Sequence, residues 1–498
     1  MPQEEKNIIT KPPVVVVVGH IDHGKSSLLE AIREDFKITQ KESGGITQHI
    51  GAYEAEFQGK KITFIDTPGH EAFSAMRARG AKVADIAVLV VDAAEGVKDQ
   101  TKEAISFIKK ADIPLVVALN KIDKKEAQPE RVKQELAKQG VLVESYGGKV
   151  PCCNVSAKTK VGIQELLETI LLVAELEDLK ADISVPGQGT IIESYLDSKK
   201  GPVATLILEK GILKEDDVFG TPSTIGKVKN LKDFRGKTIK NALPAQPVIV
   251  LGFEMPPGVG ENFEVFKTQE EAKENIVKTE KKWTPAVIQE KEGQNALNII
   301  LKADVLGSTE AIEHVLRNIP QEKVLLRILK SEVGNIEVSD IKLAESTDSL
   351  IFGFRVNIDE TTKLFAQQKK VRWKIFDVIY DIVQEVRKGM VEVMEPEVKR
   401  INLGKIKISV LFKKSKNSQI VGGKVIEGEI ERNSLAEVQR NDEIIGKGKI
   451  KSLQQEKKDI PSAGKGKECG MLFQGETELK EGDILVFFRE EKKKGLLF

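Results

Sequence analysis

Short apolar runs alternate with amphipathic stretches along the first third of the chain. The runs are rich in β-branched residues and have the length of parallel strands that are buried on both faces. They lie at residues 14–18, 62–66, 86–92, 115–120 and 150–156, and stretches with helical spacing lie at 25–33, 100–110, 129–139 and 163–177. Residues 13–180 are therefore predicted to form an α/β domain with crossover helices, preceded by a tail of residues 1–12.

The pattern changes further along the chain. Residues 181–267 and 397–498 consist of short apolar strands separated by turn signals, which is typical of β-barrels. Residues 285–373 return to alternating strands and helices, which predicts a small α/β domain. The charged segment 268–284 is predicted to be a linker, and the apolar positions of 374–396 predict a long amphipathic connecting helix. The expected fold class is a multidomain α/β plus β protein.

Composition excludes several protein classes. Hydrophobic residues make up 40% of the 498 residues and charged residues 31%, which is the balance of a globular protein with several domains. The purest apolar run, residues 14–18, is far shorter than the roughly 20 residues that cross a bilayer, so no membrane partner is expected. No secretion signal is evident, and three cysteines cannot form a disulfide framework, so the cytoplasm is expected.

The net charge of +1 hides an uneven distribution. Residues 1–180 sum to −2, residues 181–396 to −3 and residues 397–498 to +6. A solvated lysine-rich surface explains the positive C-terminal segment as well as a site for RNA does.

One glycine-rich segment carries the strongest chemical signal. Residues 19–26 read GHIDHGKS, which matches the phosphate-binding pattern GxxxxGK[ST] between a predicted strand and a predicted helix. In that setting backbone N–H groups wrap phosphate oxygens, Lys25 reaches the β- and γ-phosphates, and the Ser26 hydroxyl binds Mg²⁺. The residues predicted to contact the nucleotide here are Gly19, His20, Ile21, Asp22, His23, Gly24, Lys25, Ser26 and Ser27.

Three further segments follow predicted strands in the order that a guanine-nucleotide site requires. In DTPGH, residues 66–70, Asp66 would hold Mg²⁺ through water and the Gly69 N–H would meet the γ-phosphate. In NKID, residues 120–123, the Asp123 carboxylate can accept hydrogen bonds from the guanine N1–H and exocyclic amine, a pair that adenine lacks. The other predicted contacts are Asn120, Lys121 and the loop Ser156, Ala157 and Lys158. Together these segments predict GTP as the nucleotide.

The GH-x-D-x-GK[ST] loop and the DTPGH segment resemble those of the translational GTPases, which couple GTP hydrolysis to docking on the ribosome. The resemblance implies that the Thr47 hydroxyl completes the Mg²⁺ coordination and that His70 is the catalytic residue that positions the attacking water. Phosphoryl transfer needs such positioning more than covalent chemistry. The alternative for His70 is a partly buried histidine that only helps to fix the loop.

Longer segments resemble one family in that superfamily, bacterial translation initiation factor two, over nearly the whole chain. They read GGITQHIGA at 44–52, DTPGHEAFSAMRARGA at 66–81, KADVLGSTEAI at 302–312 and ECG at 468–470. The resemblance implies a ribosome-stimulated GTP hydrolase that promotes binding of formylmethionyl initiator tRNA and joining of the ribosomal subunits. The implied partners are both subunits, ribosomal RNA and that tRNA, and a monomer is expected. Only about a dozen residues precede the first strand, which is a very short N-terminal extension for this family.

In this family the terminal barrel holds the formylmethionyl end of the tRNA. Cys469 and Gly470 belong to the ECG tract, and Lys465 and Lys467 lie beside it on what should be an exposed loop, so these four residues are predicted to contact the tRNA. Cys469 could equally be a small core residue, because free cysteines are commonly buried.

Two other functions remain open from the sequence. One is a GTP-dependent carrier of a specialised aminoacyl-tRNA, against which the second α/β domain argues. The other is a GTP-gated RNA-binding protein that acts in ribosome assembly and delivers no tRNA.

Overall fold

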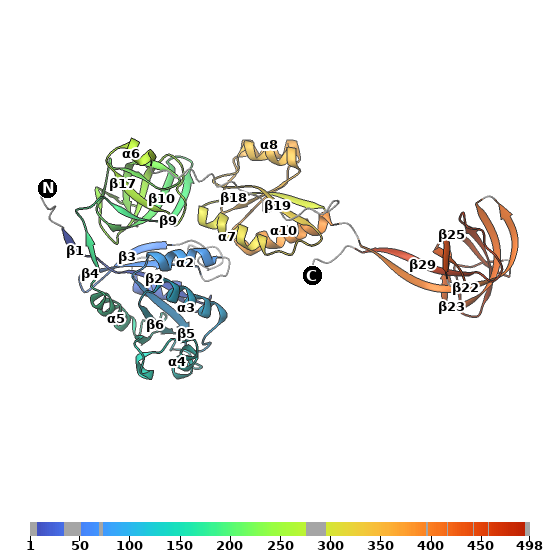
Figure 1. Ribbon diagram of the computed structural model, residues 1–498, viewed down its shortest axis with the longest axis horizontal. Helices are drawn as coiled ribbons and strands as arrows, with labels where there is room; N and C mark the ends of the chain where they lie inside the picture. The colour runs from blue at the N-terminus through green and yellow to red at the C-terminus, as the bar shows by residue number, and fades with distance from the viewer. Residues whose placement is uncertain are drawn as a thin grey trace. The chain divides into compact units, whose positions relative to one another are not determined.

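The computed structural model describes residues 7–33, 51–68, 73–274, 295–394, 397–415, 417–441, 443–456 and 458–493. Its contacts divide the chain into two compact units, Met1–Met390 and Val391–Phe498, and each unit is described by itself (Figure 1). The first unit contains an α/β region, a ring of β-strands and a smaller α/β region. The second unit is a further ring of strands.

The N-terminal α/β region is built on a six-stranded sheet with the order β3-β4-β2-β5-β6-β7. Neighbouring strands are parallel, except that β3 runs antiparallel to β4. The strands are β2 (Val14–Gly19), β3 (Gly51–Phe57), β4 (Lys60–Asp66), β5 (Ile86–Asp92), β6 (Leu115–Asn120) and β7 (Cys152–Asn154). The helices are α1 (Lys25–Ile32), α2 (Ser74–Val83), α3 (Asp99–Ala111), α4 (Pro129–Lys138) and α5 (Ile163–Leu176), with a 3₁₀ turn at Glu144–Tyr146.

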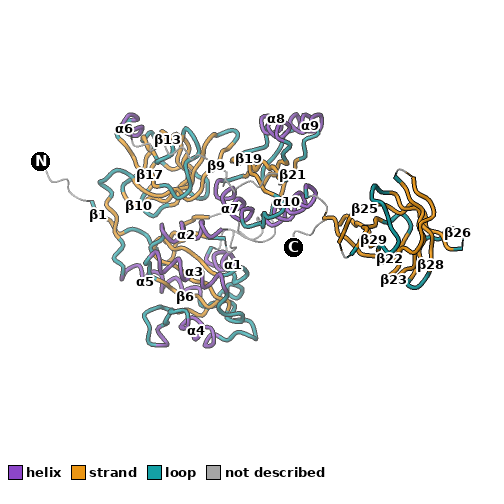
Figure 2. The backbone as a smooth tube through the Cα atoms, turned by 45° about the vertical axis from the view of Figure 1, so that its right-hand side comes forward, coloured by secondary structure: helices purple, strands orange, loops and turns teal. Residues whose placement is uncertain are grey.

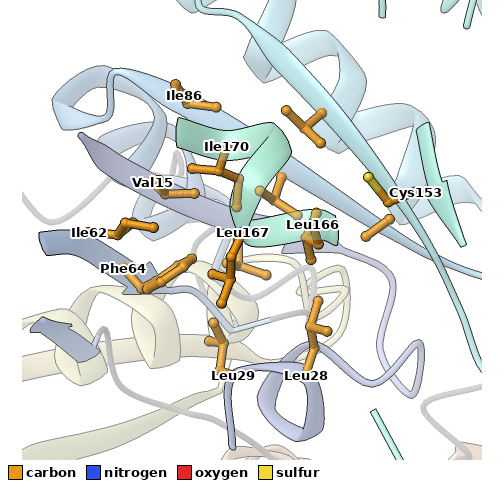
Figure 3. Packing of buried hydrophobic residues seen from close by; sticks show 14 of the residues in the cluster. Val15, Leu28, Leu29, Ile62, Phe64, Ile86, Cys153, Leu166, Leu167 and Ile170 are labelled. Atoms are coloured by element: carbon orange, nitrogen blue, oxygen red, sulfur yellow. The ribbon is translucent and has the colours of Figure 1, made fainter. Parts of the chain in front are cut away.

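Successive side chains of β2 point to opposite faces of the sheet, and helices cover both faces. Val15 and Val17 face a core that also contains residues of α1 and α5, and Figure 3 shows Leu166, Leu167 and Ile170 of α5 lying against it. Val16 faces the opposite side, where α2 packs so closely that a Cβ on Gly80 would lie 3.1 Å from Val16 Cγ2. Both faces of the sheet are therefore covered, which explains why all five valines of this run are buried.

A ring of antiparallel strands follows in the same unit. The order is β12-β17-β9-β10-β16-β13-β14, and β12 also pairs with β13, which closes the ring. Its strands are β9 (Gln188–Asp197), β10 (Gly201–Lys210), β12 (Val218–Gly220), β13 (Ile225–Asp233), β14 (Thr238–Ile239), β16 (Pro247–Phe253) and β17 (Asn262–Phe266). Two short pairs lie beside it, namely β11 (Leu213–Lys214) with β15 (Asn241–Ala242), and β1 (Ile8–Thr10) with β8 (Lys180–Asp182). Part of the predicted linker 268–284 is the short helix α6 (Gln269–Glu274), and its residues 275–284 lie outside the described ranges.

The smaller α/β region has a four-stranded parallel sheet of order β19-β18-β20-β21. Its elements are β18 (Ala296–Ala303), α7 (Leu306–Arg317), β19 (Leu325–Val333), α8 (Val338–Thr347), β20 (Leu350–Phe354), α9 (Glu360–Lys369), β21 (Trp373–Phe376) and α10 (Ile379–Val393). Figure 2 shows α7, α8, α9 and α10, in purple, around the orange strands of this region.

The predicted helix over residues 374–396 needs correction. Residues 374–376 are part of β21, because they pair with β20, and the helix begins only at Ile379. A Cβ on Gly389 would lie 3.0 Å from Leu297 Cδ2, so α10 packs closely on this region's own sheet. Helix α10 is therefore a layer of the smaller α/β region, and the described residues contain no long connecting helix.

The second unit is again a closed ring of strands. The order is β22-β29-β24-β25-β28-β23-β27, and pairing of β22 with β23 closes it. The strands are β22 (Glu397–Ser415), β23 (Ser418–Glu431), β24 (Leu435–Arg440), β25 (Glu443–Gln455), β26 (Lys458–Asp459), β27 (Ser462–Gly464), β28 (Glu468–Gln474) and β29 (Ile484–Lys493). Among the described helices of the whole chain, none is long and apolar enough to cross a membrane.

Candidate functional site

The glycine-rich loop joins β2 to α1 at the carboxyl end of the sheet. A Cβ on Gly19 would lie 2.3 Å from the Val90 carbonyl oxygen of β5, so only glycine fits there. Gly24, with φ +85°, is the residue that precedes α1. The loop is further held by Gln100 of α3, whose Oε1 accepts a hydrogen bond from the Ile21 N–H at 3.0 Å. The sequence alone does not reveal this role of Gln100, because an isolated glutamine on a helix belongs to no recognisable motif.

Lys25 lies at the start of α1 and is buried. Its ammonium donates hydrogen bonds to the carbonyl oxygens of Gly19, at 3.0 Å, and His20, at 2.8 Å. Burial lowers the pKa of Lys25 to about 8, while the nearby Asp66 carboxylate acts in the opposite direction. An ammonium has three donors, so one remains for a phosphate oxygen in this geometry.

His23 is a buried histidine within the glycine-rich loop. Its side chain is fully buried, and burial together with the neighbouring His20 lowers the His23 pKa to about 3, so the imidazole is neutral. Any contact between His23 and a nucleotide would therefore come from its backbone. Ile21, Asp22, Ser26 and Ser27 are half-buried or exposed.

Asn120 links three segments of the predicted site. Its amide Nδ2 donates to the His23 carbonyl oxygen at 2.9 Å, while Oδ1 accepts from the N–H groups of Lys121, at 2.8 Å, and Ala157, at 3.1 Å. Segments that lie about 100 and 37 residues apart along the chain thus meet at one buried side chain. The structure brings the NKID and SAK segments together beside the glycine-rich loop.

Asp123 and Ser156 form the part of the site predicted to bind the base. The Ser156 hydroxyl donates to Asp123 Oδ1 at 2.6 Å, and this bond lowers the pKa of Asp123. Ser156 is buried, whereas Asp123 and Lys158 are exposed. The carboxylate is therefore ionised at neutral pH, and the Ser156 hydroxyl holds its Oδ1.

A buried carboxylate that belongs to none of the predicted site segments lies next to these residues. Asp92 ends β5, and its Oδ2 forms ion pairs with Lys121 Nζ at 2.9 Å and Lys124 Nζ at 3.0 Å. Burial acts to raise the pKa of Asp92, but the hydrogen bonds from Lys121, the Ala94 N–H and Lys124 outweigh it and lower the pKa to about 2. Its position at the carboxyl end of an apolar run, like that of Asp66, was the signal that could have found it.

Among the residues predicted to act at Mg²⁺ and the γ-phosphate, Asp66 is described by the structure and three others are not. Asp66 is buried at the end of β4, and its charge acts on the pKa values of both Lys25 and Tyr53, which places it beside the glycine-rich loop. Thr47, Gly69 and His70 lie outside the described residues.

The second unit contains a surface cavity of about 610 Å³ over the ECG tract. Its lining comes from β22, β23, β25, β28 and Glu456, and it includes Phe412, Ile420, Gly422, Glu468, Cys469 and Gly470. Gly422 lies directly opposite Gly470 in the β23–β28 pairing, so the backbone itself forms the wall of the cavity at these two positions. Cys469 is both a member of the ring's core and a lining residue, and burial raises its pKa to about 11. Lys465 and Lys467 are exposed on the adjoining loop, not in the lining.

Comparisons with known proteins cover most of the chain. Residues 11–175 match the elongation factor Tu GTP binding domain, residues 186–266 match elongation factor G domain 2, and residues 268–387 match the model named translation-initiation factor 2. Among solved structures, the chain is similar to GDP-bound aIF5B from Aeropyrum pernix, with 25% identity, a TM-score of 0.46, and coverage of 96% of this chain and 92% of that one.

Curated relatives extend the similarity over the whole chain. Translation initiation factor IF-2 of Carboxydothermus hydrogenoformans is 42% identical over 510 aligned residues, which cover 100% of this chain and 62% of the relative. The IF-2 of Caldanaerobacter subterraneus is 42% identical, with 99% and 71% covered, and that of Caldicellulosiruptor saccharolyticus is 43% identical, with 98% and 58% covered. The chain thus spans about six to seven tenths of the length of these relatives, and it belongs to the translation initiation factor IF-2 family.

Proposed function

We propose that this protein is a ribosome-stimulated GTP hydrolase of translation initiation, which promotes binding of formylmethionyl initiator tRNA and joining of the ribosomal subunits. The observation that carries the proposal is the meeting of the glycine-rich loop, the NKID segment and the SAK segment at Asn120, in a chain of the IF-2 family. Family membership supports the ribosome, ribosomal RNA and initiator tRNA as partners, and the cytoplasm as the place of action.

Magnesium is proposed as the metal that accompanies the nucleotide. Mg²⁺ prefers few carboxylates and otherwise takes phosphate, hydroxyl and water oxygens. Asp66 supplies a carboxylate beside the loop, Ser26 supplies a hydroxyl at the start of α1, and Thr47 is the proposed second hydroxyl. When bound, Mg²⁺ would neutralise charge on the β- and γ-phosphates.

Hydrolysis is proposed to depend on His70 as the residue that orients the attacking water. We expect His70→Ala to bind GTP normally and to lose the stimulation of hydrolysis by ribosomes, because phosphoryl transfer relies on positioning. Turnover should be measured with and without ribosomes. Unchanged stimulated turnover would favour the alternative, in which His70 only fixes the loop.

The terminal ring is proposed to hold the formylmethionyl end of the tRNA in the cavity over the ECG tract. A cavity of about 610 Å³ lies within the range of small-molecule sites, roughly 300 to 1,000 Å³. Phe412 and Ile420 supply apolar surface, and Lys465 and Lys467 lie at the adjoining loop, where they are proposed to meet phosphates.

Filling this cavity tests the proposal without disturbing the ring. A Cβ on Gly470 would meet no atom closer than the Val421 carbonyl oxygen at 4.0 Å, so Gly470→Val places its side chain in the open space of the cavity. We expect this variant to lose retention of formylmethionyl-tRNA on filter binding and to keep GTP hydrolysis. Gly464→Val is the matched control, because a Cβ there meets nothing within 4 Å and Gly464 does not line the cavity.

The two alternative functions predict other outcomes in the same assay. A preference for elongator over formylated initiator tRNA would indicate a carrier of a specialised aminoacyl-tRNA. Affinity that stays the same without the formylmethionyl group would indicate an RNA-binding protein of ribosome assembly.

A further inference from the structure

A buried carboxylate lies between the NKID segment and the loop that follows β5. Asp92 is the last residue of β5, and its side chain is fully buried. In the pairing of β5 with β6 it lies opposite Asn120, the first residue of the NKID segment. A carboxylate removed from water is costly unless its oxygens are bound and its charge is paired. Its partners therefore show what the burial achieves.

The two oxygens of Asp92 face different partners. Oδ1 accepts hydrogen bonds from the N–H groups of Ala94, at 2.8 Å, and Glu95, at 3.3 Å, in its own turn. Oδ2 forms ion pairs with the ammonium groups of Lys121, at 2.9 Å, and Lys124, at 3.0 Å. Because the turn holds one oxygen of this planar group, the other oxygen points in a set direction toward the two lysines.

Lys121 extends this contact to the glycine-rich loop. Its ammonium also donates a hydrogen bond to the Asp22 carbonyl oxygen. Its stem passes close to Gly24, because a Cβ placed there would lie 3.6 Å from Lys121 Cε. The Lys121 side chain is 26% exposed, so it is accessible to a ligand. This predicted nucleotide contact is therefore held between a buried carboxylate and the loop.

The backbone is unusual at both ends of the contact between Lys121 and Asp22. Each residue has φ of +62°, in the left-handed region that residues other than glycine rarely adopt. Such conformations persist where surrounding contacts fix them, and they gather at ligand sites. The Lys121 ammonium supplies one such contact, and Asp92 supplies its counter-charge.

We propose that Asp92 is a positioning residue for the base of the bound nucleotide. Its carboxylate holds the Lys121 ammonium, and the apolar stem of Lys121 then lies where the flat face of the base can pack on it. GDP and GTP share this base, so Asp92 governs how long either nucleotide stays bound. The inference rests on the guanine-nucleotide binding of the proposed function, and it adds a residue that acts through Lys121.

The two lysines explain why a charge is needed at this position. Both ammonium groups lie within 3.0 Å of Asp92 Oδ2, and two positive charges this close to one point repel each other unless a negative charge lies between them. Without the carboxylate, we expect the Lys121 ammonium to leave the Asp22 carbonyl oxygen and turn toward solvent.

The test measures how fast bound GDP leaves the full chain, at a temperature below the unfolding of every variant. Asp92→Asn removes the charge and keeps an acceptor for the turn, and Lys121→Met removes the ammonium but keeps most of the stem. The two changes are also combined in one double variant. Lys124→Met is the matched control, because Lys124 pairs with the same oxygen, whereas Lys121 makes the contact with the glycine-rich loop.

We expect Asp92→Asn and Lys121→Met each to release GDP about 10- to 100-fold faster than the unchanged protein, since bonds to charged groups carry effects of that size. A non-hydrolysable GTP analogue should leave faster by the same factor. The double variant should release GDP no more than about twofold faster than Lys121→Met, because Asp92 acts through a group that is then absent. Lys124→Met should change the rate by less than about fivefold, since its 39% exposed side chain makes a weaker ion pair.

Effects that multiply in the double variant would overturn the inference, because they would show that Asp92 acts independently of Lys121. A Lys124→Met protein that releases GDP as fast as Asp92→Asn would also overturn it, since that result indicates a general loosening of the NKID segment. If Asp92→Asn folds poorly, the smaller Asp92→Ser takes its place in the same comparison. An unchanged protein that does not bind GDP would instead contradict the proposed function, and this inference with it.

Discussion

Single buried polar side chains organise the nucleotide site more than the exposed ones do. Asn120 is 1% exposed and connects three segments, and Asp92 is fully buried and holds two lysines. Buried polar groups are tolerated because their hydrogen bonds are made, so loss of either side chain would leave its partners unsatisfied. At this scale, buried residues orient the ones that are proposed to touch the nucleotide.

The charge of Asp92 predicts a pH dependence of stability. Its pKa in the folded protein, about 2, lies below the ordinary value of 3.8, so the ion pairs stabilise the fold above about pH 4. This contribution, on the order of 2 kcal/mol, is lost as the pH falls from about 4 through about 2. We expect Asp92→Asn to lower the unfolding temperature at pH 6, with a smaller difference from the unchanged protein at pH 3.

Calorimetry checks this prediction. The unfolding transition to follow is the one whose midpoint temperature rises when GDP is added, since a ligand stabilises the domain that binds it. Asp112→Asn, an exposed position at the end of α3, controls for the loss of any acidic charge. A difference for Asp92→Asn that stays constant from pH 6 to pH 3 would contradict the titration argument.

The Asp123 carboxylate is expected to determine which nucleotide base the site prefers. Asparagine at this position would present one donor and one acceptor, whereas guanine offers two donors to a carboxylate. We expect Asp123→Asn to lose at least about tenfold in GTP affinity and to gain affinity for xanthosine triphosphate, which carries a carbonyl in place of the amine. Competition binding of the two nucleotides measures this, and equal GTP affinity would rule out contact with the base.

At the scale of elements, the site is a set of loops at the carboxyl ends of parallel strands. β2, β4, β5 and β6 each end in a residue of the site, namely Gly19, Asp66, Asp92 and Asn120. Parallel strands place these ends at one edge of the sheet, which is where open α/β sheets bind ligands. The loop after β2 begins at Gly19, which lies against the backbone of β5. Its conformation therefore depends on the absence of a side chain at Gly19.

Gly19→Ala tests that dependence. The added Cβ would lie 2.3 Å from the Val90 carbonyl oxygen, and φ at this residue is +150°. We expect a loss of nucleotide binding and of several kcal/mol in unfolding free energy, because backbone atoms of the central sheet would have to move. Gly59→Ala is the control, since φ there is +76° with nothing within 4 Å, and only about 1 kcal/mol of backbone strain is expected. Thermal unfolding and GDP titration measure both, and equal effects would contradict the prediction.

At the scale of the molecule, buried contacts join the regions within the first unit. The Thr63 hydroxyl of β4 donates to the Ala245 carbonyl oxygen of the strand ring at 2.6 Å. Glu193 of β9 accepts from the Gly307 N–H at the start of α7 at 3.3 Å, and a carboxylate at a helix N-terminus is favourable. Single hydrogen bonds therefore join the nucleotide-binding region to the ring, and the ring to the smaller α/β region. Substituting one side chain would remove either bond.

Thr63→Val removes one of these contacts while keeping the shape of the side chain. The Ala245 carbonyl would then be buried without this donor, at a cost of about 1 to 3 kcal/mol. We expect faster hydrogen exchange at the Ala245 amide, which donates to the Leu208 carbonyl oxygen at 2.7 Å. Thr205→Val, on a half-buried residue of β10, serves as control, and unchanged exchange at Ala245 would show that the contact does not join the regions.

The sequence by itself predicted five of the six strands in the sheet of the nucleotide-binding region, the four signature segments and the family, because strand burial and phosphate binding impose local patterns on adjacent residues. It did not predict the edge strand β3. It did not reveal the buried contacts that Asp92 and Gln100 make at the candidate site, since their partners Lys121 and Ile21 lie far away along the chain. Nor did it separate β21 from α10, because the apolar residues 375, 378 and 379 have helical spacing. Only the pairing of residues 373–376 with β20 shows that a strand precedes the helix. Tertiary structure decided these features, because long-range contacts alone satisfy a buried charge or pair a short strand.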